Sequence, residues 1–249
     1  WSPRGAIIVK PYPKGVVKLM GGMAFRAPSL YQMYYQNPVQ RASLDLEPER
    51  VKSGEVEMTH RFDSRLSATA AGFLNYVTGL TVGLGEGTPE NKFYTANSGT
   101  PVLAYGGELE LRRDWQGGWM ASANYSIQRS EYTDNTEGLR NVPNSPTHMG
   151  SFRTGFPVIG KTLMATSRLT LESFRYDRNE LPSDPPQGKT NSAAIWDLVF
   201  SGQADRFTYS VGAYNAGDHR HRAPVSAEYR MRSVPQNGRT FLFSLGAEI

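Results

Sequence analysis

The segment from Tyr105 to Gln128 alternates apolar and polar side chains along two arms, and this alternation constrains the fold most. In the first arm, two leucines alternate with charged residues: Leu109 and Leu111 against Glu108, Glu110 and Arg112. In the second arm, one face carries Trp119, Ala121, Ala123, Tyr125 and Ile127. Because successive side chains leave a strand on opposite faces, the two arms are predicted strands joined by a glycine-containing turn. Each arm has the length of about 9–11 residues that a tilted strand needs to cross a bilayer. The hairpin alone fits a membrane barrel and a soluble β-sandwich equally well.

The same alternation recurs along the chain and predicts about 11 strands. They span residues 6–12, 16–26, 51–62, 65–78, the two arms of the hairpin, 146–156, 162–176, 192–203, 206–215 and 239–249. Short turns and long loops alternate strictly between these strands. Outer-membrane barrels have short periplasmic turns and long external loops, whereas a soluble sandwich rarely shows such asymmetry. The pattern therefore favours an all-β, transmembrane, antiparallel up-and-down β-barrel.

Composition excludes several other classes. The 249 residues include no cysteine, which rules out disulfides and cysteine-based metal sites. The net charge of +4 comes from dispersed basic residues, so we expect no nucleic-acid partner. No run of about 18 apolar residues is present, which excludes a transmembrane helix. The sequence starts at Trp1 without a signal peptide, so we expect this chain to be either a fragment of an exported protein or a protein that is not exported.

Short sequence blocks resemble a known family. The first block combines Phe25, Arg26, Pro28 and Ser29 with Leu46, Pro48, Glu49, Ser53 and Glu55. The second combines Asn215, Asp218 and Pro224 with Gly238 and Arg239. In order and spacing they resemble the TonB-dependent outer-membrane receptors. Three departures are Ser43-Leu44-Asp45 in place of an Asn-Pro pair, Ala216-Gly217 in place of Leu-Phe, and a terminal Ile249 in place of an aromatic residue.

The resemblance implies a fold and a function. Family barrels have about 22 strands and a plugged lumen, so residues 1–249 are expected to be the C-terminal half of such a barrel, without plug domain, TonB box or first half. The implied function is import of a scarce nutrient, such as a ferric siderophore or cobalamin, across the outer membrane of a Gram-negative cell. The implied partners are outer-membrane lipid, the nutrient chelate, and TonB through the missing plug. No cofactor and no enzymatic activity are expected.

Other readings of individual residues remain open at this stage. Tyrosines of the first long loop are the best candidates for ligand contact, because tyrosine offers apolar area with a polar group; they are Tyr31, Tyr34 and Tyr35. The alternative is that this loop packs on its neighbours and the tyrosines serve that packing. Charges that share one strand face are interpreted as a solvated lumen wall: Glu55, Glu57, Arg61, Glu108, Glu110 and Arg112. The His219-Arg220-His221 segment is interpreted as a basic loop rather than a metal site. No G-x-S-x-G, H-E-x-x-H or Walker motif is present.

Two alternative functions follow. A passive porin or adhesin barrel would lack a plug. An outer-membrane hydrolase would need one of the histidines to face a carboxylate or serine; these are His60, His148, His219 and His221.

Overall fold

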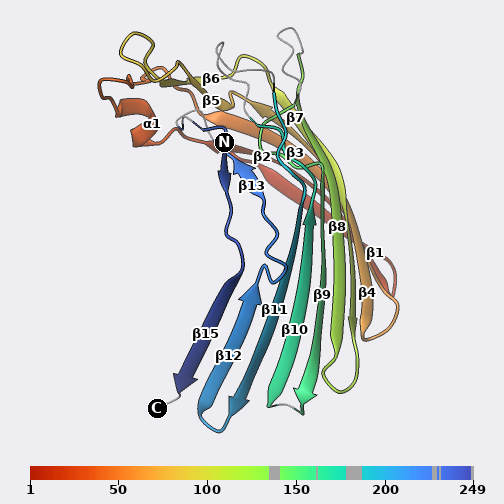
Figure 1. Cartoon of the computed structure of the whole chain (residues 1–249). Helices are drawn as coiled ribbons and strands as arrows, with labels where there is room; N and C mark the ends of the chain where they lie inside the picture. The colour runs from red at the N-terminus through yellow and green to blue at the C-terminus, as the bar shows by residue number, and fades with distance from the viewer. Residues whose placement is uncertain (135–140, 161, 178–186, 226–228, 230, 248–249) are drawn as a thin grey trace.

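One antiparallel sheet of eleven strands contains most of the chain (Figure 1). The computed structural model describes residues 1–134, 141–160, 162–177, 187–225, 229 and 231–247. Neighbouring strands pair in the order β1-β2-β3-β4-β7-β8-β9-β10-β11-β12-β15. Their bounds are β1 (Arg4–Tyr12), β2 (Gly15–Arg26), β3 (Glu49–Arg61), β4 (Leu66–Thr78), β7 (Val102–Asp114), β8 (Met120–Tyr132), β9 (His148–Ile159), β10 (Leu163–Glu172), β11 (Ala193–Ala204), β12 (Phe207–Tyr214) and β15 (Thr240–Ala247). The predicted all-β fold with about 11 strands is confirmed.

The connections divide the sheet into two unlike ends. Short turns join β1 to β2, β3 to β4, β7 to β8, β9 to β10 and β11 to β12, and we call this the turn end. The long connections gather at the opposite end, which we call the loop end and which lies at the top of Figure 1. Asp205 illustrates the tight geometry of the turn end, because its φ of 52° lies in the left-handed region that aspartate tolerates better than most residues.

Three of the long loops contain small elements that the sequence did not predict. The first holds the short helix α1 (Leu30–Tyr34). The second holds the hairpin of β5 (Thr81–Leu84) and β6 (Tyr94–Asn97), and the last holds the pair β13 (Arg222–Pro224) and β14 (Ser233–Pro235). In the described part of the chain, no helix has the length and apolar character needed to cross a membrane.

Two predicted strand ends were wrong. Strand β9 continues to Ile159, which pairs with Leu163, instead of ending at residue 156. Strand β10 ends at Glu172 rather than residue 176. The reason lies in the next residue, Ser173, whose side-chain Oγ accepts the backbone N–H groups of Thr147 and His148 at 3.1 Å each. A side chain thus takes over part of the backbone pairing, and the chain leaves the sheet.

The two faces of the sheet differ sharply in chemistry. Residues that are partners in the register of neighbouring strands form a row across the sheet, which we call a hydrogen-bonded row. One such row carries Met58, Ala70, Leu109, Tyr125, Gly150, Leu171 and Ala194, and we call its side the apolar face. The next row toward the loop end, on the opposite side, carries Glu57, Ala71, Glu108 and Ser126, and we call that side the charged face. The apolar face is uncovered: Leu109 is 59% exposed and Phe243 is 72% exposed. Within the described ranges, no large side chain is fully buried. The sheet therefore has no layer packed on either face, unlike a soluble sandwich.

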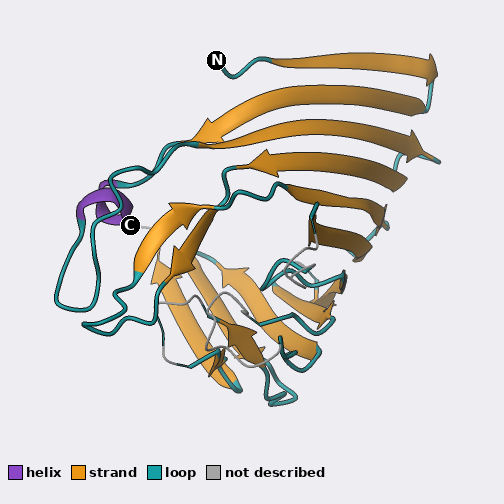
Figure 2. Ribbon diagram, turned by 90° about the horizontal axis from the view of Figure 1, so that it is seen from above, coloured by secondary structure: helices purple, strands orange, loops and turns teal. Residues whose placement is uncertain are grey.

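The sheet is an open trough with two free edges, β1 and β15 (Figure 2). Every pairing is antiparallel and the strand number is odd, so the two edge strands run in the same direction, from the loop end to the turn end. Pairing β15 with the β1 of an identical, similarly oriented copy would join parallel strands. An antiparallel closure thus needs a different segment that contributes an odd number of strands.

Close approach of neighbouring strands gives a testable difference between two glycines. A Cβ on Gly106 of β7 would lie 2.3 Å from the Ile127 carbonyl oxygen and 2.8 Å from the Phe73 ring. A Cβ on Gly54 of β3 would meet no atom within 4 Å. We expect Gly106→Ala to lower the free energy of unfolding by about 1–3 kcal/mol through overpacking. The matched control Gly54→Ala should leave it unchanged within about 0.5 kcal/mol. Equal effects of the two substitutions on denaturant titration would contradict the register of β7 and β8.

Candidate functional site

The loop end carries the candidate binding surface, and its first part is α1 with the three tyrosines singled out in the sequence. Ser29 caps this helix: its Oγ accepts the Gln32 N–H at 3.2 Å, and the Gln32 side chain accepts the Ser29 N–H at 3.0 Å. The rings of Tyr31 and Tyr35 stack with centroids 4.6 Å apart. All three tyrosines face solvent, with exposed fractions of 52% for Tyr31, 58% for Tyr34 and 40% for Tyr35. The loop thus presents an aromatic surface rather than burying it.

The β5–β6 hairpin and the residue before β6 bond the part of the first loop that follows α1. The backbone of buried Phe93 donates to the Val39 carbonyl and accepts from the Arg41 N–H, each at 2.9 Å. The hydroxyl oxygen of Ser43, which is also buried, accepts the Thr95 N–H at 2.9 Å. The Arg41 guanidinium lies 3.6 Å from the centre of the Tyr94 ring, a cation–π contact. Two loops distant in sequence therefore form one layer.

An ion pair ties that layer to the sheet where β2 ends and β3 begins. The Arg26 guanidinium donates to both oxygens of Glu49, at 2.8 and 2.6 Å. Glu49 also accepts the Thr81 N–H at 2.8 Å and so reaches the hairpin. Burial raises the pKa of Glu49, but the hydrogen bonds from Arg26 and Thr81 outweigh burial, and the pKa lies below its ordinary value. The hydrogen bond with Glu49 raises the pKa of Arg26.

Most remaining residues of the first sequence block lie within three residues of Arg26 or Glu49 along the chain. Leu46 is buried. Next to it, the Glu47 N–H donates to the Asn97 side chain, which in turn donates to the Glu47 and Gly79 carbonyls. Pro28 precedes the helix cap and Pro48 precedes β3, whereas Phe25 is 57% exposed. Glu55 lies apart on the charged face. The sequence offered no signal for Asn97, which links three segments of the layer.

The second sequence block forms a clasp between β12 and β15. Buried Asn215 adopts a left-handed φ of 48°, and its side chain bonds the backbone of His219 twice and the Asn237 carbonyl once. Asp218 accepts the Arg239 N–H at 2.9 Å. A Cβ on Gly238 would lie 2.7 Å from that Asp218 carboxylate, which accounts for the glycine. These residues position the start of the last strand. Ile249 lies outside the described residues.

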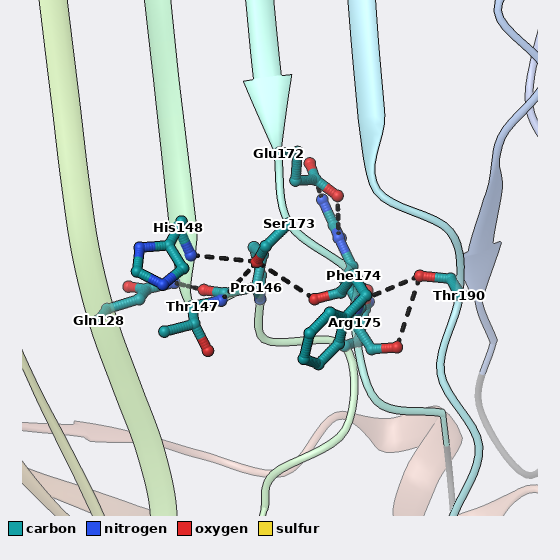
Figure 3. A network of polar contacts seen from close by, with 10 residues as sticks. Gln128, Pro146, Thr147, His148, Glu172, Ser173, Phe174, Arg175 and Thr190 are labelled. Carbon is teal, nitrogen blue, oxygen red and sulfur yellow. Dashed lines mark hydrogen bonds and ion pairs between the residues drawn. The ribbon is translucent and has the colours of Figure 1, made fainter.

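A polar network around Ser173 fixes two further loops, as Figure 3 shows. Besides accepting from the start of β9, Ser173 donates to the Phe174 carbonyl at 3.3 Å. Arg175 donates to both oxygens of Glu172 and to the Asn144 side chain. Its backbone N–H donates to the Thr190 hydroxyl at 3.0 Å. Beside the network lies a cavity of about 410 Å³, lined among others by Arg129, Glu131, His148, Phe174 and Tyr176.

The charged residues predicted for a lumen wall do share one face. Glu55, Glu57, Glu108 and Glu110 line a common cavity of about 310 Å³. Lys18 donates to Glu57 at 2.6 Å. Arg112 pairs with Asp114 at 3.0 Å near the turn end, and Arg61 lies in the same hydrogen-bonded row as Arg112.

The histidines give no support to hydrolysis or metal binding. Two rings bond tyrosine hydroxyls and two bond backbone carbonyls: His60 with Tyr12, His148 with Tyr125, His219 with Ser192 and His221 with His219. In the part of the chain that the structure describes, no histidine ring bonds a carboxylate or a serine hydroxyl. Nor does that part contain a group of three or more His, Asp or Glu residues suited to a metal ion. The surface offers hydrogen bonds, charges and aromatic rings, which suit recognition of a polar ligand.

We expect the Arg26–Glu49 pair to stabilise the protein in a pH-dependent way. Glu49→Gln should lower the free energy of unfolding at pH 7 by about 1 kcal/mol, a small value because Arg26 is largely exposed. A depressed pKa contributes stability above the unfolded value of about 4.3, and this contribution is lost as pH falls through the lower folded pKa. The gap between wild type and variant should therefore narrow as the pH falls below about 4.3. Glu47→Gln is the control, since the contacts that the structure shows for Glu47 come from its backbone. A gap that stays constant as the pH falls from 7 into the acid range would contradict this role.

Comparison with known proteins places the fold. The family described as TonB dependent receptor-like, beta-barrel matches residues 1–216. A search of curated proteins finds no match. Similar solved structures include the copper transporter OprC, with 18% identity over 97% of this chain and 38% of that chain and a TM-score of 0.71. The FrpB iron transporter from Neisseria meningitidis has 12% identity over 98% of this chain and 38% of that chain, with a TM-score of 0.72. The ferric yersiniabactin uptake receptor FyuA from Yersinia pestis has 20% identity over 97% of this chain and 36% of that chain, with a TM-score of 0.71. The chain spans less than two fifths of these structures.

Proposed function

The chain belongs to the TonB-dependent receptor-like β-barrel family, and we propose that it forms part of an outer-membrane receptor that imports a scarce nutrient. The family is an outer-membrane family of Gram-negative bacteria. The observation that carries the proposal is the two-faced sheet: an uncovered apolar face, a charged face, short turns at one end and long loops at the other. In an outer-membrane barrel the apolar face contacts lipid, the charged face lines the lumen and the long loops are external.

We propose that residues 1–249 are the C-terminal half of the barrel. Support comes from the two free edges, because every backbone N–H and C=O group in a bilayer must find a partner. An antiparallel closure requires an odd number of added strands, and about 11 would complete the barrel of about 22 strands. Those strands would have to run from the turn end to the loop end at both edges. An N-terminal half that leads into β1 at the loop end meets this requirement.

The nutrient we propose is a metal ion or a metal chelate such as a ferric siderophore. The similar solved structures include a copper transporter, an iron transporter and a ferric yersiniabactin uptake receptor, which supports this class. The exposed tyrosines of α1 supply an aromatic surface at the loop end where such a chelate would first bind. Energy would come from TonB acting through a plug elsewhere in the protein. Binding and import of such a nutrient require no covalent bond to be made or broken.

Uptake measurements test the proposal. Cells that produce the intact protein should accumulate a labelled ferric chelate in a saturable manner, and loss of TonB should abolish that uptake. Cells that produce residues 1–249 alone should accumulate none. Saturable uptake at nanomolar to micromolar ligand indicates a receptor, whereas uptake that rises linearly with concentration and ignores TonB would establish the passive porin instead.

The aromatic surface on α1 gives a separate prediction. Substitution of Tyr31, Tyr34 and Tyr35 together by alanine should weaken ligand binding to whole cells about tenfold or more, because two or three aromatic contacts are removed. Leu44→Ala is the control, since Leu44 is 60% exposed in the same loop. Equal binding by the triple variant and the control would remove the tyrosines from the binding surface.

A further inference from the structure

Four arginines lie in one hydrogen-bonded row across the charged face. The row passes from Arg61 through Ser67 to Arg112, then through Ser122 to Arg153 and Arg168, and ends at Asp197. Residues of one row share a face because the side-chain period of a strand is two. The acidic residues Glu57 and Glu108 lie in a different row, nearer the loop end. The charged face is therefore divided into an acidic part and an arginine row.

Two of these arginines stand directly opposite each other. Arg153 on β9 pairs in register with Arg168 on β10, and like charges in opposite positions destabilise a sheet. Arg168 donates to one Asp197 oxygen at 3.1 and 2.7 Å, while the other oxygen accepts the Asn215 N–H at 3.0 Å. The Asp197 side chain is only 9% exposed, and both of its oxygens already accept hydrogen bonds. Among the described residues no carboxylate lies within 4.0 Å of Arg153, and one positive charge is left uncompensated.

A cavity opens beside this pair and is rich in hydroxyl groups. Its volume is about 340 Å³. Its lining includes two guanidinium groups, one carboxylate and three hydroxyls: Arg153, Arg168, Asp197, Thr166, Ser201 and Tyr214. The structure shows no side-chain hydrogen bond for these three hydroxyls within its described residues. The cavity thus offers two kinds of hydrogen-bond donor, charged guanidinium groups and neutral hydroxyls.

We propose that this cavity is a binding site for an oxyanion, a carboxylate or phosphate group, held by Arg153 and Arg168 and by the surrounding hydroxyls. Guanidinium groups bind carboxylate and phosphate oxygens in pairs, and such charge-assisted hydrogen bonds are the strong ones. An anion between the two arginines also relieves the repulsion between them. The group has two possible sources: a free anion in the lumen, or an acidic side chain of another segment inside the barrel. Neither source depends on nutrient import, so failure of this inference leaves the proposed function untouched.

The test compares wild type, Arg153→Gln and Arg61→Gln in the intact protein, with inorganic phosphate as the probe. Arg61 lies in the same row and on the same face but does not line the cavity, so Arg61→Gln is the matched control. Thermal midpoints are measured against phosphate concentration, with chloride at equal ionic strength as reference. If free anions use the site, phosphate raises the wild-type midpoint to a plateau, and Arg153→Gln weakens the apparent affinity about tenfold or more while the control retains it.

If an internal carboxylate uses the site, phosphate has no effect on wild type, and Arg153→Gln lowers the midpoint while Arg61→Gln does not. That difference should narrow as the pH falls below about 4, because the carboxylate is then progressively protonated, at a pKa that the two arginines lower. The proposal is overturned if phosphate acts equally on all three proteins, or if it acts on none and both substitutions have the same effect on the midpoint.

Discussion

Backbone hydrogen bonding without water is the constraint on which the structure depends. A strand in a bilayer must bond its N–H and C=O groups to neighbouring strands, since no solvent is available. Every strand of the sheet has a paired neighbour on both sides except β1 and β15, which have one neighbour each. Because these edge strands run in the same direction, an identical copy in the same orientation cannot close the sheet antiparallel. The same constraint therefore supports the proposal that an odd number of further strands completes the barrel.

Much of the wall could be predicted from the sequence because its signal is local. Alternation such as Glu108-Leu109-Glu110-Leu111 fixes both the strand and its orientation, and a slip of one residue would turn every leucine to the charged face. One of the errors arose where a side chain replaces backbone partners. Phe174 and Tyr176 continue an apolar pattern, yet Ser173 takes over the pairing and ends β10. Such a competition is decided by a neighbouring strand and leaves no mark in the local pattern.

The candidate site was less predictable for the same reason. Composition pointed to the tyrosines of the first loop, but the bonds of that loop through Phe93 and Ser43 join segments about 50 residues apart. The sequence marked Arg26, Glu49 and Asn215 only by their resemblance to a family pattern, and the structure gives them physical roles as an ion pair and a clasp. The pairing of Arg153 with Arg168 required the register of β9 and β10. Each of these contacts follows ordinary rules of hydrogen bonding and charge. Which residues come together, however, depends on the order and register of the strands.

The most direct test of the account is the environment of the two faces in the membrane. Residues 1–249 contain no cysteine, so a single cysteine introduced there is the one thiol in this part of the protein, and any cysteine elsewhere in the intact protein is first replaced by serine. Four substitutions along β7 suffice: Glu108→Cys, Leu109→Cys, Glu110→Cys and Leu111→Cys in the intact protein. We predict that a membrane-impermeant maleimide labels the two glutamate positions, and that a lipid-soluble maleimide labels the two leucine positions, with a strict period of two. Labelling of all four by the impermeant reagent would show that both faces contact water, and it would contradict the membrane barrel.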